Sequence, residues 1–204
     1  MKKIIRESHS LTLARDLGKA ADRIFVDIVH ELWERIDEAV VAKFKDEGLS
    51  QGIPSAFGRE RIERTFGLSR KHIPSWHGLY YPLGGTDDNQ DAPSLGIEIN
   101  SGCDFFIGIR CRREGSEGLT AVKGAYAAIQ KAVSDSPSAD FERDNDPWWP
   151  CWRYVLRDSR SFTFENAVKL ETVEAQKEIA KEIAEELRKL WTTLKDHSDT
   201  QHLF

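Results

Sequence analysis

The sequence predicts an α+β fold in which an antiparallel sheet of three to five strands is packed by three main helices, the last of them long and C-terminal. Apolar residues recur every three to four positions in three long segments, which is the period of an amphipathic helix. Two shorter runs alternate apolar with other residues, which is the period of a half-buried strand. The chain has 204 residues, 40% of them hydrophobic, and it carries no internal repeat. We therefore predict one domain over residues 1–204.

The three helices are predicted over residues 20–45, 118–134 and about 165–195. The first ends before Gly48, a helix stop signal, and its apolar positions are Ile24, Ile28, Leu32, Ile36 and Val40. The apolar positions of the last helix are Val168, Ile179, Ile183, Leu187, Leu190, Trp191 and Leu194. Their spacing fits packing inside the fold, and it also fits a coiled coil with a second helix.

The strand candidates lie between the first two helices, with one more near residue 150. Leu79–Leu83 is a short apolar run, and Leu95–Ile99 and Phe105–Cys111 alternate on either side of a five-residue link that contains Gly102. This arrangement predicts an antiparallel hairpin. If the aliphatic rows share one face, the opposite face carries Glu98, Phe106, Arg110 and Arg112. The second half of residues 147–156 predicts a further strand, because its first half holds two prolines.

The amino-acid composition argues against several classes of protein. The chain has 29 Lys and Arg against 34 Asp and Glu, a net charge of −5, which argues against a generally basic nucleic-acid binder. Its three cysteines are not closely paired, which indicates a reducing compartment and no disulfide scaffold. No stretch approaches the roughly 20 apolar residues of a membrane span. We expect a cytoplasmic protein with no membrane partner.

The usual catalytic motifs are missing. The sequence contains no phosphate-binding loop, dinucleotide fingerprint, nucleophile elbow or zinc-protease motif. Cys103, Cys111 and Cys151 lack the paired spacing of zinc ligands, so no metal site is predicted from them. The motifs leave the question of an enzyme open and favour a protein without catalysis or cofactor.

A basic stretch lies at residues 59–72, where five Lys and Arg face two Glu. The five are Arg59, Arg61, Arg64, Arg70 and Lys71. The guanidinium group of arginine can donate two hydrogen bonds to phosphate oxygens. This stretch, together with Arg110 and Arg112, is therefore a candidate binding site for a polyanion. An ordinary solvated helix face explains the same pattern.

Three tryptophans fall within five residues at Trp148, Trp149 and Trp152, followed directly by Arg153. Trp beside Arg is typical of an interaction hot spot or of a platform on which bases stack. The alternative is that these rings close one end of a small core, because large aromatics dominate core burial.

Acidic residues offer a candidate metal site. Asp91 ends an acidic loop and Glu98 lies on the following strand candidate. Carboxylate oxygens that converge at a strand can hold Mg²⁺ for phosphoryl chemistry. A hydrophilic surface loop explains the same residues and is the interpretation that we favour.

The order helix, three strands, helix, strand, helix is similar to the core of the PD-(D/E)XK nuclease superfamily. The catalytic signature of that superfamily has D/E-x-K on the second strand of the hairpin. This chain has Ile109-Arg110-Cys111-Arg112 there, so no catalytic motif matches. The chain also resembles the non-catalytic C-terminal region of bacterial and phage proteins of that superfamily. The residues that carry this second resemblance are Trp76, Tyr80–Leu83, Leu95–Ile109, Trp148–Trp152 and the helix from Glu165. The resemblance implies a bacterial or phage accessory domain.

These observations favour a non-catalytic binding or regulatory module that engages another protein first and nucleic acid second. One alternative is a divergent metal-dependent nuclease-like hydrolase, with Mg²⁺ held by Asp91 and Glu98 as its catalytic residues. A second is a homo-oligomeric scaffold joined through the C-terminal helix.

Overall fold

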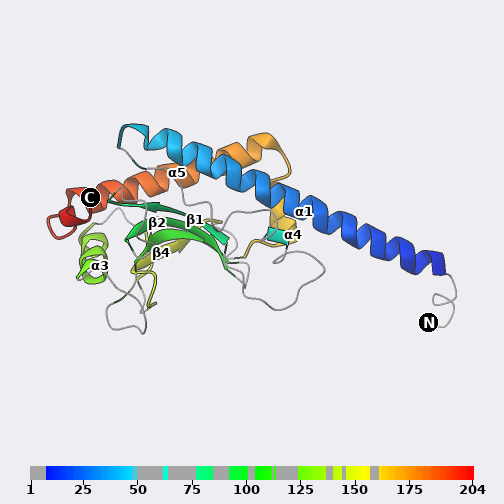
Figure 1. Ribbon diagram of the computed structural model, residues 1–204, viewed down its shortest axis with the longest axis horizontal. Helices are drawn as coiled ribbons and strands as arrows, with labels where there is room; N and C mark the ends of the chain where they lie inside the picture. Colours follow the sequence, from blue (N-terminus) through cyan, green and yellow to red (C-terminus); the bar gives the residue numbers. More distant parts are fainter. Residues whose placement is uncertain are drawn as a thin grey trace.

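A four-stranded antiparallel sheet lies at the centre of the computed structural model, with its strands in the order β1-β2-β3-β4 (Figure 1). The strands are β1 His77–Pro82, β2 Ser94–Ile99, β3 Phe105–Arg110 and β4 Cys151–Tyr154. The structure describes residues 8–47, 49, 62–63, 77–84, 92–100, 104–111, 113, 124–136, 140–143, 146–156 and 161–204.

The described part of the chain also contains four α-helices. They are α1 Ser8–Lys43, α3 Ala125–Asp135, α4 Phe164–Lys169 and α5 Val173–Asp196. The short 3-10 turn η2 Lys45–Glu47 follows α1, and η4 Gln201–Leu203 follows α5. Figure 1 shows α1 and α5 side by side over one face of the sheet, and α3 near the C-terminal part of α5. The predicted α+β class is confirmed. No helix among the described residues has an apolar stretch long enough to cross a bilayer.

The predicted hairpin forms as β2 and β3, with Leu95 opposite Ile109 and Ile97 opposite Ile107. Because side chains alternate along each strand, this register turns the aliphatic rows to the same face. β4 pairs with the other edge of β3, so the strand expected near residue 150 is also present.

The main core lies between the aliphatic sheet face and the helices α1 and α5. Edge-to-face aromatic pairs connect the two layers: Phe25 with Phe162, Phe162 with Phe105, and Phe105 with Trp33. From α5, Ile183, Leu187, Leu190 and Leu194 are buried in this core. The apolar stripe of α5, whose spacing also fits a coiled coil, is therefore buried within the fold.

The helices differ from the prediction at three places. The helix expected to start at residue 118 begins at Ala125, because Gly124 before it has a left-handed φ of 75° that does not continue a helix. The single helix expected over 165–195 is two helices, because Thr172 caps a new one: its hydroxyl accepts a hydrogen bond from the Ala175 amide at 3.2 Å. Val168 consequently lies on the short α4 and is 50% exposed rather than part of the buried stripe. At the other end of the chain, α1 begins twelve residues before the predicted start at 20, and Ile24 is 54% exposed.

Candidate functional site

The sheet face opposite α1 and α5 carries a layer of aromatic side chains. The strand register sets Tyr80, Gly96, Gly108 and Trp152 in one row across the four strands. The next row runs through Gly78, Glu98, Phe106 and Tyr154. We call this surface the aromatic face; its members are Tyr80, Phe106, Arg110, Trp148, Trp149, Trp152 and Tyr154.

Two glycines form the floor of the aromatic face. A Cβ atom built on Gly96 would lie 2.6 Å from Cη2 of Trp149, so the Trp149 indole sits directly on the backbone of β2. At Gly108 a Cβ atom would lie 2.2 Å from the Cys151 carbonyl oxygen. The missing side chains let the Trp149 ring and the β4 backbone approach the sheet closely.

The aromatic rings contact one another edge to face. Phe106 meets Trp149 at a centroid distance of 4.9 Å and Trp152 at 6.1 Å. Trp152 in turn meets Tyr154 at 4.9 Å. Phe106 and Trp149 are buried at the bottom, whereas Trp152 and Tyr154 are half-buried and reach the surface.

The segment before β4 is held by main-chain and carboxylate hydrogen bonds. One Asp146 carboxylate oxygen accepts from the amides of Trp148 and Trp149, at 2.7 and 3.0 Å. The Trp148 carbonyl accepts from the Cys111 amide at 2.8 Å, which fastens this segment to the end of β3. These bonds fix the backbone that carries both rings.

Arg110 lies between two rings of the aromatic face. Its guanidinium carbon is 5.0 Å from the centroid of Tyr80 and 5.4 Å from that of Trp148. Such cation–π contacts hold a charge against an aromatic surface while part of the guanidinium faces water. Arg110 and both rings are half-buried, so each of the three keeps part of its surface accessible to solvent.

Glu98 lies beneath this surface and is 3% exposed. The Tyr80 hydroxyl donates a hydrogen bond to its carboxylate. A buried carboxylate needs such donors, because its desolvation is otherwise costly. Asp91, its predicted partner for Mg²⁺, lies outside the described residues, so the nuclease-like pair stays a prediction. Among the described residues, no three His, Cys, Asp or Glu side chains cluster as metal ligands would.

Arg153 is separated from the tryptophans with which it was grouped. Strand alternation turns it to the helix face, where it forms a 3.2 Å ion pair with Glu186 of α5 and lies 5.8 Å from the Phe141 ring. Only 13% of its side chain is exposed. In this structure Arg153 joins β4 to α5.

Of the predicted site residues, Arg110, Trp148, Trp149 and Trp152 come together on the aromatic face. The predicted basic residues Arg59, Arg61, Arg64, Arg70, Lys71 and Arg112 lie outside the described residues. The sequence reading missed Tyr80 and Tyr154. Both could have been found by alternation, because Tyr80 lies between two core-facing residues, Leu79 and Tyr81, and Tyr154 follows Trp152 by two positions.

Comparison with known proteins gives no relative to set beside this geometry. No protein-family model matches the chain, and neither the curated proteins nor the solved structures contain a significant match.

Proposed function

We propose that this protein is a non-catalytic binding module that engages a protein partner through the aromatic face. The observation that supports the proposal is the half-buried group formed by Arg110 between Tyr80 and Trp148, on the same face of the sheet as Trp152. Trp, Tyr and Arg are the residue types enriched at the energetic centres of protein interfaces. The resemblance noted in the sequence supports a bacterial or phage system, and the spacing of the three cysteines supports a cytoplasmic setting.

The rigidity of the face supports a binding role. Its rings stand on three hydrogen-bonded strands and on a loop tied to Asp146. Because the side chains of this face are already ordered, they lose little conformational entropy when a partner binds. Preorganisation of this kind raises affinity by lowering the cost of binding.

The surrounding charges favour a protein over nucleic acid. Carboxylates stand next to the rings: Glu98 lies beneath Tyr80, Asp146 lies behind Trp148, and the exposed Glu142 pairs by its backbone with Trp152. A phosphate would meet the exposed Glu142 carboxylate, whereas binding of nucleic acid is dominated by cations that neutralise phosphates. A partner that presents apolar and aromatic side chains fits the face better.

The proposal is tested by photo-crosslinking. A photoreactive benzophenone amino acid at position 148 is expected to capture a discrete protein in bacterial cells that express the module. The same probe at the exposed Val168 on α4 is the control and is expected to leave that protein uncaptured.

The captured protein is then purified and titrated. Trp152→Ala is expected to weaken its binding by about 30-fold, the effect of losing a hot-spot residue of about 2 kcal/mol. Val168→Ala should leave the affinity unchanged, and circular dichroism confirms that both variants are folded. Equal affinity for folded Trp148→Ala, Trp152→Ala and wild type would overturn the proposal, as would crosslinking to nucleic acid alone.

A further inference from the structure

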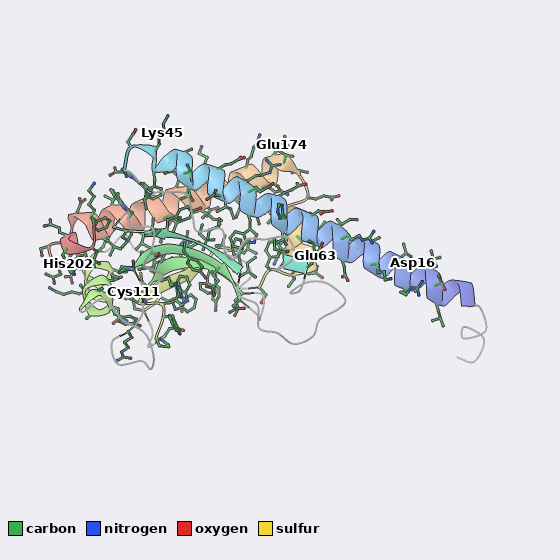
Figure 2. The ribbon with its side chains drawn as sticks, viewed as in Figure 1. Asp16, Lys45, Glu63, Cys111, Glu174 and His202 are labelled. Atoms are coloured by element: carbon green, nitrogen blue, oxygen red, sulfur yellow. The ribbon has the colours of Figure 1, made fainter. Side chains whose placement is uncertain are left out.

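The N-terminal part of α1 projects beyond the rest of the molecule (Figure 1). The first buried core residue on the helix is Phe25, and the residues before it carry exposed apolar side chains. Leu13 and Leu17 are each 61% exposed and Ile24 is 54% exposed. In Figure 2, Asp16 lies on this projecting part, far from Lys45 at the other end of the helix.

The exposed apolar residues form a seam with coiled-coil spacing. Leu13, Leu17, Ala20 and Ile24 are separated by four, three and four positions, which are the a and d spacings of a heptad. At 3.6 residues per turn they lie within about 60° of one another around the helix axis. Leu11, although 60% exposed, falls on the opposite side. The direction of the seam continues along α1 through exposed Glu31 and Glu38, so it faces away from the sheet.

From this seam we infer that two copies of the chain associate through their projecting α1 segments as an antiparallel helix pair. Antiparallel alignment about a twofold axis near Gly18 places Leu13 against Ile24 of the other copy, and Leu17 against Ala20. This self-matching arrangement is what a closed, symmetric dimer requires. The surface is separate from the aromatic face.

The flanking residues are complementary in this one orientation. In an antiparallel pair each g position lies near a g position of the other helix, and here these are Asp16 and Arg23. The twofold axis therefore brings Asp16 near Arg23 twice. A parallel pair would set Asp16 opposite Ala21 and gain no ion pair.

The remaining contacts are compatible with this alignment. Asp16 also meets Arg15 of its own helix at 3.2 Å, but both are mostly exposed, and such neighbouring pairs contribute little. On the other flank of the seam, Ala14 and Ala21 are small, which lets the two helices approach closely. The seam is only about 17 Å long, so the dimer is expected to be weak, with a Kd on the order of 100 μM.

Sedimentation equilibrium of the full chain over a concentration series tests the inference. The wild type is expected to show a monomer–dimer equilibrium. Leu17→Glu should raise the dimer Kd at least tenfold, because it places a charge in the seam. Leu11→Glu is the matched control: the same substitution at an equally exposed leucine opposite the seam should leave the Kd unchanged.

Charge reversal tests the orientation. Asp16→Arg alone and Arg23→Asp alone should each raise the dimer Kd, because each homodimer would carry two like-charge contacts. An equimolar mixture of the two variants should form heterodimers, since both contacts are then attractive. A monomeric wild type at about 1 mM, equal effects at Leu11 and Leu17, or no heterodimer in the mixture would overturn the inference.

Discussion

At the scale of single residues, Gly96 and Gly108 occupy paired positions on β2 and β3 where a methyl group has no room. The obstacles differ. At Gly96 the nearest atoms belong to the Trp149 side chain, which can move, whereas at Gly108 they are the Cys151 carbonyl oxygen and the Trp152 Cα, which are backbone. The two glycines therefore lie on the same face, but a side chain at Gly96 would be tolerated better than one at Gly108.

We predict that Gly96→Ala lowers the free energy of unfolding by about 1–3 kcal/mol, and Gly108→Ala by about 3 kcal/mol or more. Gly96→Ala should also lift Trp149 off the sheet and shift tryptophan fluorescence to the red. Urea titration followed by fluorescence measures both effects. Equal stabilities of the two variants would contradict the close approaches described above.

At the scale of elements, the joint between α4 and α5 depends on polar contacts rather than on a continuous apolar stripe. Thr172 caps α5, and the fully buried Gln176 one turn later donates to the Leu170 carbonyl at 2.9 Å. The Gln176 side-chain oxygen accepts from Arg35 of α1 at 2.7 Å. The turn is thus fixed to both of its neighbours, which explains why the helix breaks here.

Thr172→Ala is predicted to lower the free energy of unfolding by about 1 kcal/mol, because the Ala175 amide loses its acceptor. Amide hydrogen exchange should rise in the first turn of α5 and stay unchanged at its C-terminal end. Thr172→Ser keeps the acceptor and is expected to retain most of the stability. An alanine variant as stable as wild type would show that the cap is dispensable.

At the scale of the whole molecule, ion pairs join η2, the turn that follows α1, to the C-terminal half of α5. Glu47 accepts from Arg188 at 2.6 Å and from Lys195 at 2.9 Å, and both cations stack on Trp191. The hydrogen bond from Lys195, followed by that from Arg188, lowers the pKa of Glu47 below its ordinary value of 4.5. A carboxyl whose pKa is lowered by folding stabilises the folded state above its unfolded pKa, and loses that contribution as the pH falls through the folded pKa.

Glu47→Gln is therefore predicted to lower the free energy of unfolding at pH 7. The difference from wild type should shrink below pH 4.5 and vanish once the wild-type carboxyl is protonated in the folded state. Urea unfolding across a pH series measures this, with Glu178→Gln on the exposed side of α5 as control. A difference that stays constant with pH would exclude the ionised carboxylate as its cause.

The periodic spacing of apolar residues was enough to predict the core elements of the fold. The hairpin of β2 and β3, the strand at Cys151–Tyr154 and the buried stripe of α5 all follow from local patterns of apolar residues. Element ends were less predictable. The early start of α1 has no apolar face buried by the body, and the cap at Thr172 competes with a helical pattern on both sides.

The aromatic face was predictable in part. Alternation correctly set Glu98, Phe106 and Arg110 on the face opposite the aliphatic rows. Trp149 and Trp152 could not be assigned to core or surface, because that depends on which strand β4 joins. The sequence reading also kept Arg153 with the tryptophans, although its strand position turns it toward Glu186.

The class of fold, the pairing of the hairpin and most of the helix-facing core were predictable from the sequence, because these follow from the local period of apolar residues. Only the tertiary structure decided that Trp148 stacks on Arg110 and that Leu13, Leu17 and Ile24 remain exposed. The physical reason is that burial and stacking depend on contacts between segments far apart in the chain. Such contacts are set by strand order and by where a helix leaves the body, and no local pattern encodes either.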